Sequence, residues 1–148
     1  GSRAPCIIRW PGKVPANQVS NAILATIDFL PTFANLTHSS IPTDRIIDGV
    51  DQTQLLLGES ETGARDTFYY QGNGFRKGNW KYLKAKHNVP GYAKDTNREL
   101  VEELHDLESD PSESKNLASE HPATVRQLKS LMLETETTTI EKNSRPKK

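Results

Sequence analysis

Aromatic and polar residues between positions 66 and 85 form a pattern that predicts two β-strands joined by a glycine-rich turn. Residues 67–70 and 80–83 are rich in Thr, Phe, Tyr and Trp, which favour strands. Residues 71–74, Gln-Gly-Asn-Gly, accept the positive φ values that a tight turn requires. An isolated hairpin is only marginally stable in water, so we expect this one to pack against other elements.

The chain opens with a short apolar run at residues 4–10, APCIIRW, which ends at a Pro-Gly pair. A bounded run of this length is typical of a strand buried on both faces, as in a parallel sheet. Such a strand requires neighbours that the rest of the sequence does not supply. Cys6 lies in this run, and the absence of a nearby histidine or cation in the sequence favours a small buried hydrophobe over a nucleophile.

A helix is predicted to begin at Asp28, which can cap the free amides, with Pro31 in the first turn. It ends before residues 38–40. Residues 41–58 then read as a connector, and the polar residues 59–65 as a boundary between two units. The connector holds three carboxylates, whose spacing favours turn and cap roles over a calcium loop: Asp44, Asp48 and Asp51.

After the hairpin, residues 86–98 are polar and rich in turn formers, and residues 102–107 predict a third strand. The adjacent His105 and Asp106 resemble half of a catalytic pair. Because adjacent strand residues face opposite sides of a sheet, the sequence favours a structural role for both.

Two helix starts follow. Asp110 can cap a helix with Glu113 in a capping box, and Pro122 can begin another. Four apolar residues after Pro122 fall on one face at helical spacing: Val125, Leu128, Leu131 and Met132. From position 134 the chain becomes polar, and we expect the helix to fray there.

The composition and the motifs that are missing exclude several classes of function. Hydrophobic residues make up 34% of the 148 residues, which is lean for an independent globular domain. The 19 basic and 19 acidic residues balance, so no net field attracts nucleic acid or anionic membrane. No apolar stretch reaches the roughly 20 residues of a membrane helix. The sequence contains no phosphate-binding loop, dinucleotide fingerprint or metal-spaced histidine cluster.

Five segments, taken in their order and spacing, resemble the C-terminal part of type I sulfatases, the arylsulfatase-like and formylglycine-dependent family. The resemblance covers residues 3–132. The matching segments are RAPCIIRWPGKVP (3–15), TIDFLPTFANL (26–36), DGVDQTQLLLG (48–58), FYYQGN with WKYL (68–73 and 80–83), and LHDLESDPSESKNLA (104–118).

The resemblance implies an α/β fold related to alkaline phosphatase, with a smaller C-terminal subdomain that carries a four-stranded antiparallel sheet and a closing helix. On this template, residues 1–58 are the end of the large domain and residues 59–135 are the small subdomain. Residues 136–148 are a polar tail. The resemblance therefore explains the apolar run at residues 4–10, because in the family the other strands of its sheet belong to the N-terminal part of the sulfatase.

The resemblance also implies hydrolysis of sulfate esters. In the family, a Cys or Ser in a C/S-x-P-x-R motif becomes formylglycine, and calcium with nearby cations stabilises the sulfate charge. Cys6 is followed by Ile7-Ile8-Arg9, which lacks the proline and has the wrong spacing. We therefore assign no catalytic and no metal-binding residue to this chain. Formylglycine and calcium are expected in the N-terminal part of the same sulfatase, and this chain alone is expected to be inactive.

The resemblance places the predicted turn beside the substrate cleft. There the amides of Gln71 and Asn73 could bond sugar hydroxyls, and Arg76 or His87 could contact a second anionic group; alternatively, Asn73 only completes a turn. The implied partners are the N-terminal part of the sulfatase and a sulfated carbohydrate or aryl sulfate, and the implied location is periplasmic, secreted or lysosomal. The alternative function is a non-catalytic carbohydrate-binding or protein-interaction module with the aromatic hairpin as its platform.

Overall fold

The computed structural model describes residues 4–70, 73–85 and 101–143, with side chains of the last helix through residue 138. The chain divides into two compact units, Gly1–Asp66 and Thr67–Lys148. The division falls at the first residue of the first strand, eight positions beyond the boundary expected after residue 58.

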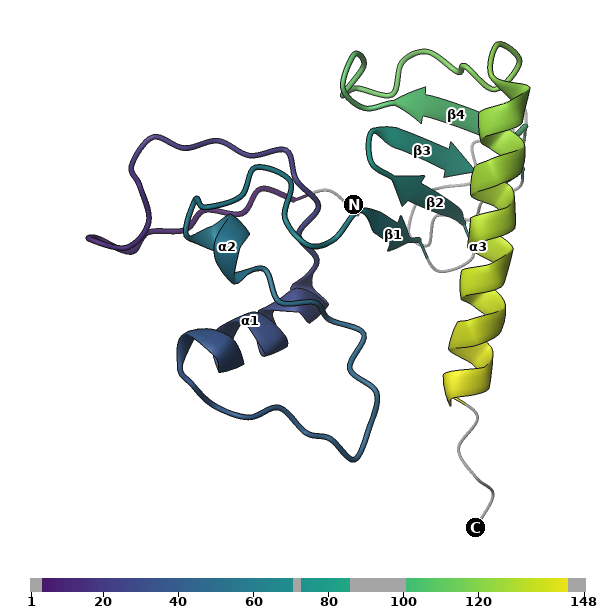
Figure 1. Cartoon of the computed structure of the whole chain (residues 1–148). Coiled ribbons are helices and arrows are strands. Elements are labelled where there is room, and N and C mark those ends of the chain that lie inside the picture. The colour runs from purple at the N-terminus through teal and green to yellow at the C-terminus, as the bar shows by residue number, and fades with distance from the viewer. Residues whose placement is uncertain (1–3, 71–72, 86–100, 144–148) are drawn as a thin grey trace, which may run out of the picture. The chain divides into compact units, whose positions relative to one another are not determined.

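The first unit contains a 3₁₀ helix, η1 (Thr26–Asp28), which continues into α1 (Phe29–Leu36), and a short helix α2 (Thr53–Leu56) (Figure 1). The start of α1 after Asp28 and its end before residue 38 confirm the sequence prediction. Helix α2 lies in the segment that was predicted to be a connector. A helix of four residues is too short to show a periodic hydrophobic pattern in the sequence.

The prediction of a buried strand at residues 4–10 is wrong for this chain. These residues form no strand and are exposed, with Ile7 93% exposed. The physical reason is the one that made the prediction unusual: a parallel strand is satisfied only by neighbouring strands, and all four described strands belong to the second unit. Cys6 is likewise exposed and not the buried hydrophobe we expected.

The second unit is built on an antiparallel sheet of four strands in the order β1-β2-β3-β4 (Figure 1). The strands are β1 (Thr67–Tyr69), β2 (Gly74–Lys77), β3 (Trp80–Leu83) and β4 (Glu103–Asp106). Four antiparallel strands are the number that the family resemblance implies. The predicted hairpin was wrong in its pairing, however, because β2 lies between β1 and β3 and pairs with both.

Strand β2 escaped prediction because it holds only one strongly strand-favouring residue, Phe75, among Gly, Arg and Lys. The turn that follows it consists of Gly78 and Asn79, since Lys77 pairs directly with Trp80. Gly78 has φ +53°, as a two-residue hairpin turn of this kind requires.

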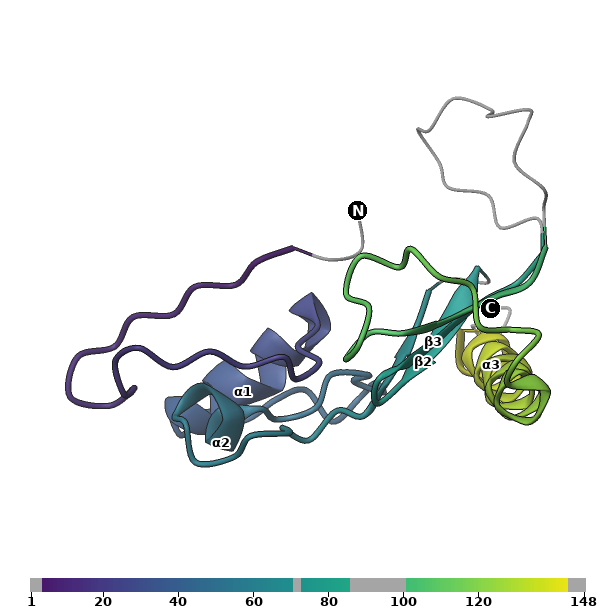
Figure 2. The same cartoon turned by 90° about the horizontal axis from the view of Figure 1, so that it is seen from above.

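Helix α3 (Pro122–Asn143) covers one face of this sheet (Figures 1 and 2). Its start at Pro122 confirms the prediction, and it continues past position 134, where we expected fraying. The sheet and the helix together bury one apolar cluster: Phe75, Tyr82, Leu104, Val125, Leu128 and Met132. The last three belong to the predicted apolar face of the helix, while Leu131 is partly buried against the cluster.

The helix predicted to start at Asp110 does not form. The Asp110 carboxylate instead accepts hydrogen bonds from the Lys115 amide and from the hydroxyls of Ser112 and Ser114, and so closes an irregular turn. Glu113 has φ +58°, which interrupts any helix at that position.

Candidate functional site

Of the four residues predicted to contact substrate, the structure describes two, Asn73 just before β2 and Arg76 within it. Gln71 and His87 fall outside the described residues. The Asn73 amide donates to the Tyr70 carbonyl at 3.0 Å, and its own carbonyl accepts from the Lys84 amide at 3.0 Å. The Asn73 backbone is therefore already engaged in the hairpin, which leaves its half-buried side chain as the group that could meet a ligand.

Arg76 lies on the sheet face opposite α3, because Phe75 beside it points into the core. Its Nε donates to the Gly78 carbonyl at 2.8 Å, so the guanidinium is held against the turn of its own hairpin. Asn73 directly precedes β2, whereas the Arg76 side chain is bonded to the turn that follows the strand, so the two are not brought to a common point among the described residues.

His105 and Asp106 do not form a catalytic pair. The His105 ring contacts the Lys115 carbonyl through Nδ1 at 2.9 Å and the Glu103 carboxylate through Nε2 at 3.1 Å. Asp106 accepts hydrogen bonds from the Glu108 amide and the Ser109 hydroxyl instead. The two adjacent side chains face opposite ways along β4, as the strand alternation predicted.

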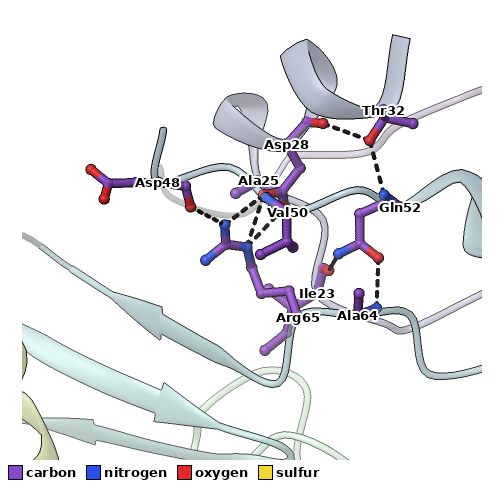
Figure 3. A network of polar contacts seen from close by, with 9 residues as sticks. All are labelled: Ile23, Ala25, Asp28, Thr32, Asp48, Val50, Gln52, Ala64 and Arg65. Carbon is purple, nitrogen blue, oxygen red and sulfur yellow. Dashed lines mark hydrogen bonds and ion pairs between the residues drawn. The ribbon is translucent and has the colours of Figure 1, made fainter. Parts of the chain in front are cut away.

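A network of polar contacts surrounds Asp28 in the first unit (Figure 3). The Asp28 side chain is fully buried, and Arg65 Nε lies 2.8 Å from its Oδ2. The same carboxylate accepts the amides of Ala25 and Val50, each at 2.9 Å. Burial alone would raise the pKa of Asp28, but the Arg65 hydrogen bonds and these two amides outweigh burial and hold the pKa below its usual value of 3.8.

Thr32 and Gln52 extend this network (Figure 3). The Thr32 hydroxyl donates to the Asp28 carbonyl at 2.6 Å and accepts the Gln52 amide at 2.9 Å. The Gln52 side chain then donates to the Ile23 carbonyl and accepts the Ala64 amide. Every buried side-chain nitrogen or oxygen among the described residues has a partner. The network is therefore a structural cross-link of the first unit with no unsatisfied group aimed at a ligand.

The predicted role of Asp28 as the N-cap of α1 is wrong. We predicted that it caps α1, but its side chain makes no capping bond to that helix and binds η1, the 48–50 segment and Arg65 instead. Arg65 lies 37 positions away in the sequence. A local sequence pattern cannot indicate a contact between residues so far apart in the chain.

Within the described ranges, no three His, Cys, Asp or Glu side chains are grouped so that they could hold a metal ion. No described helix combines the length and the apolar character of a membrane span.

Comparison with known proteins identifies the family to which this chain, with its small antiparallel sheet and C-terminal helix, belongs. The family described as "N-sulphoglucosamine sulphohydrolase, C-terminal" matches residues 1–139, and the chain belongs to this family. This finding confirms the family resemblance that the five sequence segments carried.

Individual relatives agree. The chain is 34% identical over 139 residues to the N-acetylgalactosamine-6-O-sulfatase of Bacteroides thetaiotaomicron, a match that covers 89% of this chain and 27% of the relative. It is 44% identical over 69 residues to arylsulfatase G of the dog, a match that covers 47% of this chain and 13% of that protein. The chain thus spans about a quarter or less of the curated relatives it matches.

Solved structures show the same likeness. BT33336S-sulf, solved in work on glycosaminoglycan metabolism by Bacteroides thetaiotaomicron, matches with TM-score 0.71 and 32% identity over 88% of this chain and 28% of that one. The PsFucS1 sulfatase from Pseudoalteromonas sp. matches with TM-score 0.72 at 21% identity, over 93% of this chain and 30% of that one. The second match shows the fold alone.

Proposed function

We propose that the chain serves as the C-terminal portion of an enzyme that hydrolyses sulfate esters of a sugar or an aryl alcohol. The observation that carries this proposal is the 34% identity to an N-acetylgalactosamine-6-O-sulfatase over 89% of the chain. That relative's name favours a sulfated amino sugar as the substrate class. The chain's own task is completion of the fold, with a further contribution to substrate selection.

Fold completion is supported by the apolar surface of the first unit. Around an open hollow of about 280 Å³, the helices and the 46–49 segment expose Ile27, Leu30 and Ile46, each 48% exposed or more. Residues 4–10 expose further large apolar side chains. Contiguous exposed apolar surface of this kind marks a contact that the described residues do not provide. In our proposal the N-terminal part of the sulfatase covers this surface and supplies the strands beside residues 4–10.

Catalysis requires that same N-terminal part. The group that attacks sulfur in this family is formylglycine, and calcium supplies positive charge to the sulfate. Cys6 lacks the modification motif, and the described carboxylates do not form a metal site. The proposal therefore makes the isolated chain inactive, with neither group held by it.

The test is complementation. A sulfatase carrying an upstream segment with a C/S-x-P-x-R motif is assayed with this region present, deleted, or added back as a separate chain. We expect hydrolysis of sulfated N-acetylgalactosamine only when both parts are present. Hydrolysis by the 148-residue chain alone, or undiminished activity and solubility of the upstream part alone, would contradict the proposal.

Substrate selection is assigned to the turn that holds Gln71 and Asn73, with Arg76 and His87 as candidates for a second anionic group. In the complete enzyme, Gln71→Ala with Asn73→Ala is expected to lower kcat/KM unequally among sulfated sugars. Lys77→Ala, an exposed substitution on the same hairpin, is the matched control and should leave every kcat/KM value unchanged. An unaltered ranking of substrates in the double variant would exclude this role.

The structure weakens the alternative of a free-standing carbohydrate-binding module. Such a module needs exposed aromatic faces, yet Tyr82 is fully buried and Trp80 packs beside the core and against the His121 ring. Phe68 and Tyr70 contact each other edge to face and are half-buried. The predicted aromatic platform is thus mainly the inner wall of the second unit.

A further inference from the structure

The open hollow of the first unit is lined mainly by apolar side chains from two walls. One wall is η1 with the start of α1, which contributes Ile27 and Leu30, and the other is the segment 46–49. Ile27, Leu30 and Ile46 are 48%, 51% and 62% exposed. Phe33, one turn beyond Leu30 on α1, is 53% exposed and extends the apolar surface along the helix. Large apolar residues gathered in this way, unlike singly scattered ones, mark a contact site.

The two walls are joined by polar contacts and by close approach of their backbones. The Arg65 guanidinium binds the Asp28 carboxylate of one wall and donates to the Asp48 carbonyl of the other at 2.9 Å (Figure 3). A Cβ on Gly49 would clash with the Ile27 carbonyl oxygen, so only glycine allows the walls to approach this closely. The hollow therefore keeps its shape without an occupant, and a preformed site binds at a lower ordering cost.

The size and the lining of the hollow favour a protein side chain over a small molecule. Its volume of about 280 Å³ is at the lower limit of the roughly 300–1,000 Å³ of small-molecule sites. Such sites also place several polar groups around the ligand. Among the described residues that line this hollow, only Thr26 and Asp48 have polar side chains.

Asp48 gives the lining a negative charge. The residue is exposed, and its carboxylate points away from Arg65, whose charge is matched by Asp28 (Figure 3). Within the part of the chain that the structure describes, Asp48 engages in a hydrogen bond through its carbonyl and has no partner for its carboxylate. An occupant with a Lys or Arg next to its apolar side chain would match this charge.

We propose that one large apolar side chain of the N-terminal part of the sulfatase fills this hollow, with an adjacent Lys or Arg that pairs with Asp48. The occupant belongs to the enzyme of the proposed function, on which this assignment rests. The lengths of the relatives support it. The match covers 27% of the N-acetylgalactosamine-6-O-sulfatase and 28% of BT33336S-sulf, so most of either protein lies outside the match.

A second copy of this chain fits the hollow less well. A symmetric dimer through this surface would place one hollow and its Asp48 against the same features of the other copy. That copy supplies neither a protruding apolar side chain nor a cation at this surface, since the lining of the hollow carries only the negative charge of Asp48. Upstream polypeptide is therefore the occupant to which the proposal commits.

The complementation assay tests the apolar contact. The quantity measured is the concentration of added chain that restores half of the maximal hydrolysis. For Ile46→Ala we expect an increase of about tenfold, the effect of losing a hot-spot contact. The urea midpoint of the isolated chain should not change, because Ile46 is exposed in it. Leu133→Ala, an exposed substitution on α3, is the matched control and should restore activity as the wild type does.

Asp48→Asn tests the cation of the occupant. It should raise the same concentration by a smaller factor, about two- to fivefold, and should weaken the dependence of that concentration on salt. Asp44→Asn is the control, because its exposed carboxylate already pairs with Arg45. Wild-type behaviour of both Ile46→Ala and Asp48→Asn would refute this inference and leave the proposed function intact. Failure of the wild-type chain to restore any activity would instead contradict the proposed function.

Photo-crosslinking in the complete, uncleaved enzyme identifies the occupant, and it decides the matter if the separate parts do not associate. With p-benzoylphenylalanine at position 46, we expect a cross-link to an apolar residue of the N-terminal part that has a Lys or Arg beside it, mapped by mass spectrometry. The same probe at position 133 should not yield this product. A cross-link within residues 1–148, a cross-link to a second copy, or no cross-link at position 46 would overturn the proposal.

Discussion

Arg65 and Asp28 are joined by a buried ion pair that links the end of the first unit to the start of its main helix. The guanidinium binds both carboxylate oxygens and also donates to the Asp48 carbonyl at 2.9 Å. The Asp28 side chain is fully buried, and that of Arg65 is 13% exposed. Three chain segments that have no strand pairing between them are thus held by one carboxylate.

Asp28→Asn should unfold or severely loosen the first unit. The substitution leaves the Arg65 charge buried without a counter-charge and turns an N–H toward the amide donors of Ala25 and Val50, a loss of about 3–5 kcal/mol. Amide hydrogen exchange at Val50 in the full chain measures the effect. Asp44→Asn, which removes an exposed pair in the same unit, is the control and should leave this exchange unaltered. Wild-type protection in Asp28→Asn would show that the pair is dispensable.

The same carboxylate should make the first unit sensitive to acid. Since the pKa of Asp28 is lower in the folded state than its usual 3.8, the unfolded state binds the proton more readily. The resulting stability is fully present above about pH 5 and is lost as pH falls through the folded pKa. Exchange at the Val50 amide, followed from pH 6 downward, should therefore increase with acid beyond the intrinsic trend. Arg65→Gln should reduce that dependence, and an unchanged dependence would locate it elsewhere.

The sequence predicted those features whose signals are local. Val125, Leu128 and Met132 recur at helical spacing, so the sequence alone predicts the buried face of α3. Phe75 could not be placed, because a four-residue strand with one aromatic residue carries no period. The ion pair of Asp28 and Arg65 could not be predicted either, because no local pattern selects one arginine for an aspartate 37 positions away.

At the candidate site, too, the sequence predicted only what local patterns determine. The alternation along β4 correctly separated His105 from Asp106, because the period of a strand is a local property. It did not reveal that His105 instead meets Glu103 and the Lys115 carbonyl, which requires the path of the segment after β4. The substrate roles of Asn73 and Arg76 came from the family resemblance, and they stay predictions that only assays of the complete enzyme test.

Tyr82→Phe should destabilise the second unit by about 1–2 kcal/mol. Burial, and then the hydrogen bond and charge of Glu102, raise the pKa of the Tyr82 phenol, so its hydroxyl remains protonated and donates to Glu102 at 2.7 Å. Urea denaturation of the full chain measures the change. Lys129→Gln removes the exposed partner of the same carboxylate and should cost less, at most about 1 kcal/mol. A larger loss in Lys129→Gln than in Tyr82→Phe would reverse this assignment.

Leu128→Ala should destabilise the second unit by about 2–5 kcal/mol, because the side chain is 2% exposed at the centre of the cluster under α3. Leu133→Ala on the same helix is the matched control. Its side chain is 52% exposed, so we expect a change within about 0.5 kcal/mol. The midpoint of urea denaturation reports both. Equal losses would mean that α3 does not pack on the sheet as described.

Gly74→Ala should disrupt the hairpin of β2 and β3, because a Cβ at this position would lie 2.2 Å from the Tyr82 carbonyl oxygen and 2.8 Å from a Leu83 methyl carbon. A backbone oxygen in a paired strand cannot move aside without separating the strands, so we expect the loss to exceed that of any exposed substitution in the sheet. Gly78→Asn tests the neighbouring turn, where φ is positive but a Cβ meets nothing within 4 Å. Asn tolerates that conformation, and the variant should keep nearly wild-type stability. Thermal unfolding of the two variants distinguishes the effect of a steric clash from the effect of a positive φ. Wild-type stability in Gly74→Ala would contradict the close pairing of β2 and β3 beside Tyr82.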